Sequence, residues 1–199
     1  MKGSPIAAVL CAPGTNRDSD VSFALTQAGA TPISYLMSDL ISQPSRIDDA
    51  DIIVIAGGFS YADALGAGRL FAVELENSIG DRIGAAIAER RPVIGICNGF
   101  QTLVRMGILP EDNGLVALGH NDGGVFDCRW IEMEPVSKKC IWTRNLTENI
   151  HCPIAHGEGR LTAGSSTVSD LLKNDQVALR YVNGNPNGSV GDIAGICDP

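Results

Sequence analysis

Hydrophobic and polar positions follow two different rhythms in the first half of the chain. Apolar runs predict strands at residues 6–10, 51–56 and 92–96, and a further strand is expected at residues 31–37. The β-branched run at 51–56 is typical of a strand covered on both faces. Apolar residues at helical spacing predict helices at residues 18–28, 78–90 and 100–106. This βαβα order predicts an α/β fold with an open, mostly parallel sheet of flavodoxin-like type and helices on both faces. Binding sites of such sheets lie at the carboxyl ends of the strands.

The second half of the chain has a different pattern. From about residue 115 to 199, short apolar runs such as 128–133 and 177–182 are joined by loops rich in Gly, Asn and Pro. These runs predict additional short antiparallel strands in the C-terminal half. Because no repeat or low-complexity linker interrupts the chain, we expect residues 1–199 to form a single domain.

The charge, the apolar stretches and the cysteines of the chain exclude several classes of function. A net charge of −8 without any Lys/Arg run argues against a nucleic-acid partner. No apolar stretch approaches a membrane span and the N-terminus lacks the apolar core of a signal peptide, so we expect a cytoplasmic protein without membrane contact. The six cysteines are scattered without a Cys-x-x-Cys pair, which favours free thiols and no metal site.

The most informative motif is Gly95-Ile96-Cys97-Asn98-Gly99, which lies between a predicted strand and a predicted helix. A side chain presented on so sharp a turn needs neighbours without bulk, and glycines stand two residues before and two residues after Cys97. A sulfur at a helix N-terminus is stabilised as the thiolate. The motif therefore predicts a nucleophilic Cys97, although a buried packing cysteine is the alternative for the motif alone.

A second motif, Gly57-Gly58-Phe59, follows another predicted strand. Most Gly-Gly pairs after a strand are simple tight turns. Here the adjacent strand end carries Cys97, and backbone N–H groups beside a nucleophile can stabilise a developing oxyanion. Together the two motifs predict an acyl-transfer site.

These motifs and several others resemble the class I, triad-type glutamine amidotransferases, and more narrowly the glutaminase subunits or domains of phosphoribosylformylglycinamidine synthases. The resemblance covers nearly the whole chain. The segments that carry it are residues 12–16 (Ala-Pro-Gly-Thr-Asn), 57–61, 95–101, 126–130 (Phe-Asp-Cys-Arg-Trp), 154–160 (Ile-Ala-His-Gly-Glu-Gly-Arg), 185–189 (Asn-Pro-Asn-Gly-Ser) and 193–196.

The resemblance implies that Cys97 attacks the side-chain amide of glutamine and forms a γ-glutamyl thioester. It implies an oxyanion hole at Gly58, Phe59 and Asn98. The implied glutamine-binding residues are Gly57, Gln101, Asn121, Gly124 and Phe126. Ammonia would pass to a synthetase subunit or domain that uses ATP and Mg²⁺, so no cofactor is expected in this chain, which lacks a phosphate-binding loop.

Four positions depart from the family pattern. They are Ala62 and Gly66, where Gly and Arg are usual, and Gly123 and Val125, where Ser and Arg are usual.

The family's base and orienting acid lie in a His-Pro-Glu segment shortly after the residues that match 193–196. The sequence reaches Cys197-Asp198-Pro199 before such a segment, so we expect a C-terminally truncated domain with little or no turnover. His156 and Glu158 repeat the His-x-Glu spacing, but with Arg160 they match a different segment, expected in a site loop or at the partner interface. His120 and His151 are expected to be ordinary surface or loop residues.

Two other functions remain open at this stage. A DJ-1/PfpI-type cysteine hydrolase presents its cysteine on a similar strand-to-helix turn, but membership of that class would leave the segments at 12–16 and 185–189 unexplained. A non-catalytic docking or ammonia-gating domain is consistent with the missing His-Pro-Glu segment. The intact turn around Cys97 argues against such a domain, because docking alone does not need a strained turn.

Overall fold

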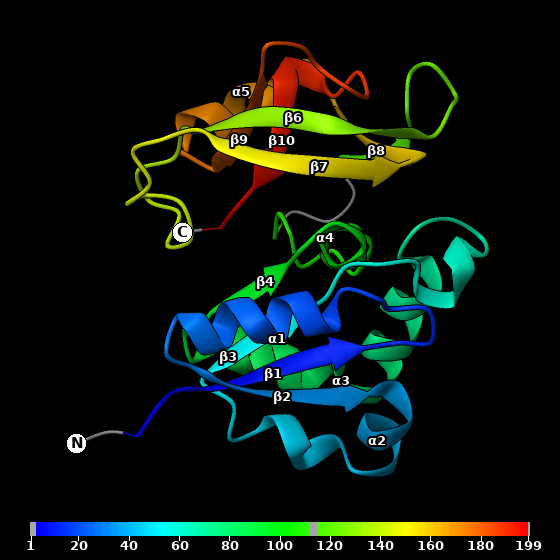
Figure 1. Cartoon of the computed structure of the whole chain (residues 1–199), viewed down its shortest axis with the longest axis vertical. Helices are drawn as coiled ribbons and strands as arrows, with labels where there is room; N and C mark the ends of the chain where they lie inside the picture. The colour runs from blue at the N-terminus through cyan, green and yellow to red at the C-terminus, as the bar shows by residue number, and fades with distance from the viewer. Residues whose placement is uncertain (1–2, 112–114, 199) are drawn as a thin grey trace. The chain divides into compact units, whose positions relative to one another are not determined.

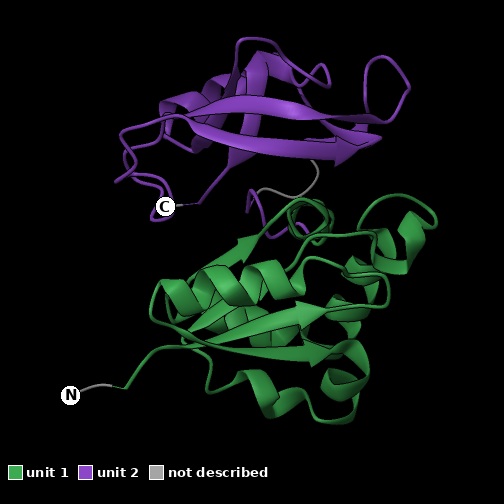
Figure 2. Ribbon diagram, viewed as in Figure 1, with its two compact units in different colours: residues 1–106 green, residues 107–199 purple. Residues whose placement is uncertain are grey.

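The computed structural model describes residues 3–111 and 115–198. The chain divides into two compact units, residues 1–106 and 107–199, which are described separately (Figure 2). The organisation of residues 1–199 as one domain stays a prediction.

Unit 1 is built on a parallel sheet with strand order β2-β1-β3-β4. Its strands are β1 (Ile6–Cys11), β2 (Thr31–Leu36), β3 (Ile52–Ile55) and β4 (Val93–Gly95). The central strands β1 and β3 are almost completely buried, as their unbroken apolar sequences predict. The four predicted strands and the parallel arrangement are thereby confirmed.

Helices cover both faces of this sheet (Figure 1). They are α1 (Asp18–Gln27), α2 (Met37–Ser42), α3 (Arg69–Ala88) and α4 (Asn98–Arg105), with the 3₁₀ turns η1 (Pro44–Ile47) and η2 (Ser60–Asp63). Val21 of α1 packs on Val9 and Val54 of the sheet. α3 begins nine residues before the predicted helix at 78–90, because Phe71 and Leu75 extend its buried stripe toward the N-terminus.

Unit 2 contains the antiparallel strands expected for the second half. One sheet has the order β10-β9-β6-β7, and β5 pairs with β8 in a two-stranded sheet. The elements are β5 (Val116–His120), β6 (Asp127–Pro135), β7 (Ile150–His156), β8 (Glu158–Ala163), α5 (Ser165–Lys173), β9 (Val177–Val182), η3 (Val190–Asp192) and β10 (Ile193–Ile196). In the described residues, no helix has the length and apolar character needed to cross a bilayer.

Candidate active site

Cys97 occupies the turn between β4 and α4, with φ +55° and ψ −111°. A non-glycine residue with positive φ is strained by about 1–3 kcal/mol, and such residues cluster at functional sites. The chain therefore makes the sharp strand-to-helix turn predicted from residues 95–99. Cys97 itself is exposed at the start of α4, within reach of a small molecule.

The two glycines that flank Cys97 are required by close backbone approach. A Cβ on Gly95 would overlap the backbone of Gly99 and Phe100, and a Cβ on Gly99 would overlap the Ile55 carbonyl at the end of β3. Neither glycine has a positive φ. Glycines are therefore needed at 95 and 99 because the turn packs tightly against β4 and against the neighbouring strand β3.

Gly57 and Gly58 follow β3 and lie against this turn. A Cβ on Gly57 would stand 3.0 Å from the Ile96 carbonyl oxygen and 3.2 Å from Cys97 Cβ. Gly58 has φ +135°, and its backbone N–H donates to the Cys97 sulfur, as does the N–H of Asn98. Two of the three predicted oxyanion donors therefore surround the sulfur.

Opposing influences set the charge state of Cys97. Although the residue is exposed, the backbone packed around the sulfur removes part of its hydration; this desolvation raises the pKa of the thiol above its ordinary value and is the largest influence. The N–H groups of Asn98 and Gly58 lower this pKa by stabilising the thiolate, the Asp63 carboxylate raises it, and Arg17 lowers it. The neutral thiol therefore predominates at neutral pH in the unliganded chain, and a proton acceptor is needed to generate the nucleophile.

The third predicted donor, the N–H of Phe59, has another partner. It donates to the Gly14 carbonyl oxygen at 3.1 Å, and the Tyr61 N–H donates to the Pro13 carbonyl oxygen at 2.6 Å. Gly58 also forms an isolated antiparallel bridge with Thr15. The loop at 12–16, a motif without an assigned role at the level of sequence, therefore fixes the backbone that carries the Gly58 N–H.

The Asn98 side chain joins the nucleophile turn to the segment that follows Gly58. Asn98 is buried, accepts a hydrogen bond from the Ser60 hydroxyl, and donates from Nδ2 to Asp63 Oδ1 at 2.7 Å. Residues 60–63 and the start of α4 are thereby held together by side chains that belong to different loops. Pattern analysis assigned only the backbone of Asn98 and did not identify this contact.

We expect Asp63→Asn to shift the pH profile of Cys97 alkylation toward lower pH. The variant keeps an oxygen that can accept from Asn98 but removes the charge that raises the Cys97 pKa. Because the thiolate reacts, the iodoacetamide rate below the pKa should rise by about two- to tenfold at a given pH. Peptide mass spectrometry between pH values of about 6 and 10 measures this rate. An unchanged pH profile, or one shifted toward higher pH, would contradict the charge effect. Asp63→Ala removes the oxygen that accepts from Asn98 as well as the charge, so comparing the two variants separates the charge effect from the effect of this hydrogen bond.

The segment after Gly58 holds a run of left-handed residues. Tyr61, Ala62 and Asp63 have φ of +54°, +53° and +52°, and Leu65 has φ +65°. Each such non-glycine residue costs about 1–2 kcal/mol. Ala62, which stands where the family usually has glycine, is therefore a source of strain beside the site.

Ala62→Gly is expected to raise the free energy of unfolding by about 1 kcal/mol, because glycine adopts this conformation without steric cost. Ala64 is the matched control, since its φ of −56° suits alanine. Ala64→Gly should destabilise the chain by about 0.5–1 kcal/mol through the entropy of the unfolded state. Urea unfolding followed by circular dichroism measures both values; a destabilised Ala62→Gly variant would show that strain is not relieved.

Gln101 lies one helical turn beyond Cys97 in α4. Its side chain is buried, and its backbone N–H donates to the Cys97 carbonyl oxygen at 3.1 Å. The structure therefore places Gln101 behind the nucleophile turn, and its predicted contact with glutamine stays a prediction.

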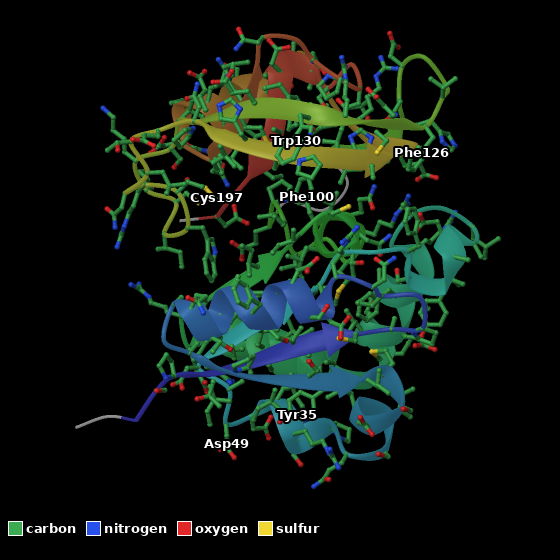
Figure 3. The ribbon with its side chains drawn as sticks, in the orientation of Figure 1. Tyr35, Asp49, Phe100, Phe126, Trp130 and Cys197 are labelled. Atoms are coloured by element: carbon green, nitrogen blue, oxygen red, sulfur yellow. The ribbon has the colours of Figure 1, made fainter. Side chains whose placement is uncertain are left out.

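The predicted pocket residues of unit 2 surround the turn after β5. Asn121 is buried and donates from Nδ2 to the carbonyl oxygens of Val125 and His156, both at 2.9 Å. Gly124, with φ +66°, donates its N–H to the Asn121 carbonyl oxygen at 2.8 Å. Phe126 is exposed immediately before β6 (Figure 3). A depression of about 340 Å³ is lined by Asn121, Gly123, Val125, Phe126, Asp127, Arg129 and Pro186.

His156 and Glu158 have different partners. His156 Nδ1 lies 2.9 Å from Asn121 Oδ1, while Glu158 Oε1 lies 3.8 Å from His120 Nδ1. Burial lowers the pKa of His156, opposed by the nearby Asp127 carboxylate. His156 Nε2 is buried and has no hydrogen-bond partner among the described residues. The His-x-Glu spacing therefore does not produce an imidazole oriented by that glutamate.

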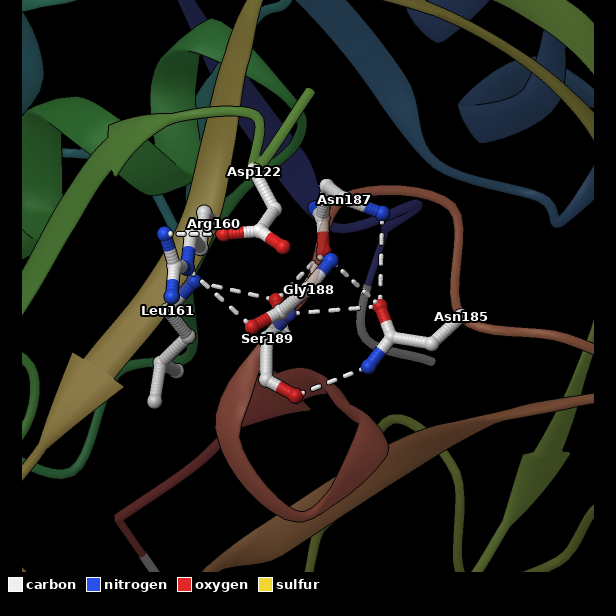
Figure 4. Close-up of polar contacts among 7 residues, drawn as sticks. All are labelled: Asp122, Arg160, Leu161, Asn185, Asn187, Gly188 and Ser189. Atoms are coloured by element: carbon white, nitrogen blue, oxygen red, sulfur yellow. Dashed lines mark hydrogen bonds and ion pairs between the residues drawn. The ribbon is translucent and has the colours of Figure 1, made fainter. Parts of the chain in front are cut away.

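The segment at 185–189 folds onto the strand that carries Arg160 (Figure 4). Asn185 Oδ1 accepts from the backbone N–H groups of Asn187, Gly188 and Ser189. Arg160 forms an ion pair with Asp122 at 2.8 Å and donates from Nε to the Gly188 carbonyl oxygen at 3.2 Å. The motifs at 154–160 and 185–189 are thus joined in unit 2 by a hydrogen bond from Arg160.

Comparison with known proteins identifies the family of the chain. Residues 4–199 match the CobB/CobQ-like glutamine amidotransferase domain. The chain is 48% identical to the phosphoribosylformylglycinamidine synthase subunit PurQ of Treponema denticola, covering 98% of this chain and 83% of that protein. It is 37% identical to PurQ of Dehalococcoides mccartyi, covering 96% and 78% of the two chains.

Two solved structures resemble the chain to different degrees. A chain in the structure of PurLQS from Thermotoga maritima superposes with a TM-score of 0.80 at 33% identity, over 98% of this chain and 82% of that one. A glutamine amidotransferase from the same organism, at 15% identity and a TM-score of 0.55, shares the fold over 82% of this chain and 65% of its own length. The chain belongs to the CobB/CobQ-like glutamine amidotransferase family.

Proposed function

We propose that this protein is the glutaminase subunit of a phosphoribosylformylglycinamidine synthase in purine biosynthesis. The observation that carries the proposal is the strained Cys97, whose sulfur receives the N–H groups of Gly58 and Asn98. The similarity to PurQ subunits over almost the whole chain supports this choice among the amidotransferases. A docking domain would have no use for such a turn, so the geometry favours catalysis.

In the proposed reaction, the Cys97 thiolate attacks the side-chain amide carbon of glutamine. The new S–C bond converts the carbonyl oxygen into an oxyanion, which lies close to the sulfur and so within reach of the Gly58 and Asn98 N–H groups. Collapse of this intermediate breaks the C–N bond, and the nitrogen leaves as ammonia after taking up a proton. Water then hydrolyses the γ-glutamyl thioester to glutamate and regenerates the thiol.

The remaining roles follow the family resemblance. Gly57 and Gln101 would position glutamine beside Cys97. Phe59 would join the oxyanion hole only after releasing its N–H from Gly14. His156, Glu158 and Arg160 would belong to a site loop or an interface.

The proposed partner is the synthetase subunit, which would use ammonia together with ATP and Mg²⁺ to aminate its ribonucleotide substrate. The proposal assigns no cofactor to this chain, and it places the reaction in the cytoplasm. The relatives are named as subunits of this synthase, and a solved complex contains a similar chain, which supports a partnered enzyme.

We expect the 199-residue chain to release ammonia from glutamine at least ~10²-fold more slowly than the Treponema denticola relative, because a positioned general base supplies about that factor. Residues 1–106 contain no histidine. His120, His151 and His156 lie beside Glu158, Glu132 and Asn121 respectively. A coupled glutamate dehydrogenase assay, with each protein alone and with a synthetase subunit, measures turnover. Equal rates would show that this chain has an effective base.

A glutamine-analogue diazo-ketone tests the function directly. We expect stoichiometric labelling at Cys97, prevented by excess glutamine and located by peptide mass spectrometry. Cys128→Ser, which removes an exposed cysteine of unit 2, should label as the unchanged chain does. Labelling that glutamine does not prevent would favour another cysteine hydrolase. No labelling at Cys97 would overturn the proposal in favour of a docking domain.

A further inference from the structure

A second pair of thiols lies far from Cys97 in the sequence and belongs entirely to unit 2. Cys140 and Cys197 are buried, with 3% and 7% of each residue exposed, and both pack against Ala178 in one small cluster. Figure 3 labels Cys197, which follows β10. Neither cysteine has a role in the proposed glutaminase reaction.

The backbone around β9 brings these two cysteines together. The Cys197 N–H donates to the Gln176 carbonyl oxygen at 2.8 Å, just before β9 begins. On the segment before Cys140, the Val136 N–H donates to the Ala178 carbonyl oxygen at 3.1 Å. The segments that carry the two thiols are thus hydrogen-bonded to neighbouring residues at the start of β9, Gln176 immediately before the strand and Ala178 within it.

Ser137 connects the two residues directly. Its hydroxyl oxygen accepts the Cys140 N–H at 2.9 Å and lies 3.9 Å from the Cys197 sulfur. The Cys197 thiol also lies 3.9 Å from the Asp175 carbonyl oxygen. Both cysteines are free thiols, although their side chains are within hydrogen-bonding contact of each other.

The surroundings favour a thiolate at Cys140. The Cys197 thiol donates to the Cys140 sulfur, and this contact lowers the pKa of Cys140 while raising that of Cys197. The Thr143 hydroxyl and the backbone N–H groups of Trp142 and Thr143 further lower the Cys140 pKa, against the opposing effect of burial. The Cys140 sulfur is therefore the nucleophile of the pair, and the Cys197 sulfur keeps its proton.

We propose that Cys140 and Cys197 form a redox-active dithiol, which hydrogen peroxide oxidises to an intramolecular disulfide. The Cys140 thiolate attacks one oxygen of the peroxide, the O–O bond breaks, and the departing hydroxide takes a proton to become water. The resulting Cys140 sulfenic acid is attacked by the Cys197 sulfur. The S–S bond forms, the S–O bond breaks, and the hydroxyl leaves with the Cys197 proton as a second water. Two thiols lose two electrons in total, and the peroxide gains them.

The other cysteines of unit 2 lack this arrangement. Cys128 lies opposite Ala155 in the β6–β7 pairing, and Cys152 lies opposite Ile131. Burial raises the pKa of Cys152, which disfavours its thiolate. Cys128 is exposed, so it is a control for oxidation governed by access to solvent alone.

The test uses the full chain, reduced and freed of reductant, then treated with hydrogen peroxide at neutral pH. Remaining thiols are blocked with N-ethylmaleimide, and peptides are mapped without reduction. We expect a cross-linked peptide joining Cys140 to Cys197, at least about fivefold more abundant than any oxidised form of Cys128. Cys197→Ser should leave Cys140 as a sulfenic acid that dimedone traps, and Cys152→Ser should retain the cross-link.

The measurement on the unchanged chain decides the outcome even if a variant folds poorly. Oxidation of Cys128 without a Cys140–Cys197 cross-link would overturn the proposal, as would complete resistance of Cys140 to peroxide. Reversal of the cross-link by a dithiol reductant, with recovery of both free thiols, would support it. This result is independent of the diazo-ketone labelling at Cys97, so the two proposals can fail separately.

Discussion

Cys97→Ser, assembled with a synthetase subunit, is expected to reduce glutamine-dependent amination to the background measured without this chain. A serine hydroxyl is far less acidic than the thiol, and nothing among the described residues of unit 1 offers an imidazole to activate it, since residues 1–106 contain no histidine. The Gly58 and Asn98 N–H groups would remain in place but would have no nucleophile beside them. The rate of substrate amination, measured with glutamine and separately with ammonium chloride, gives the comparison.

Amination from ammonium chloride should stay unchanged in this variant, because free ammonia bypasses the glutaminase step. That arm shows that the complex has assembled, so a loss confined to glutamine is assigned to chemistry at Cys97. Cys128→Ser should behave as the unchanged chain in both arms. Retention of glutamine-dependent amination in Cys97→Ser would exclude Cys97 as the nucleophile, whereas loss of both arms would indicate failed assembly.

Gly99→Ala is expected to lower the free energy of unfolding by about 3 kcal/mol or more. Gly99 is the second residue of α4, where alanine would otherwise favour the helix by about 1 kcal/mol. In this chain the new Cβ would overlap the carbonyl group of Ile55, so β3 and α4 would have to separate. Because Cys97 lies directly before α4, the same displacement should also slow its labelling by the diazo-ketone.

Gly84→Ala is the matched control for this substitution. Gly84 lies inside α3, and a Cβ added there would meet no atom within 4 Å. Helix propensity then acts alone, and the variant should be stabilised by about 0.5–1 kcal/mol. Urea unfolding measured by circular dichroism compares the two variants. Similar effects for both would show that the close approach of Gly99 to Ile55 does not constrain the fold.

The periodic elements were predictable because their signal is local. The buried strands β1 and β3 are short unbroken apolar runs, and Val177–Val182 is the strand expected at 177–182. The start of α3 was missed because residues 70–73 are all apolar, which hides the helical stripe that Phe71, Ala72 and Leu75 form in the structure. Element boundaries depend on such packing and are therefore less visible in the sequence.

The backbone turn of the candidate site could be predicted from the sequence, whereas most contacts between its side chains could not. The glycines at 95 and 99 indicated a tight turn, and the structure shows the backbone contacts that exclude a Cβ at each of them. The contact of Asn98 with Ser60 and Asp63 was not visible, since it joins loops more than thirty residues apart. Likewise, His156 and Glu158 have the spacing of a catalytic pair but different partners, because His156 ends β7 and Glu158 begins β8, which belong to different sheets.

The sequence by itself determined the α/β class of unit 1, the antiparallel character of unit 2, the position of the nucleophile turn and the resemblance to glutamine amidotransferases. These features follow from hydrophobic periodicity and from glycines at fixed offsets, both of which act over a few residues. Only the tertiary structure decided which N–H groups face the Cys97 sulfur, that the loop at 12–16 holds the Phe59 N–H, and that Cys140 contacts Cys197. Such contacts join residues distant in the chain, and they arise from how strands and loops pack together, which local patterns do not encode.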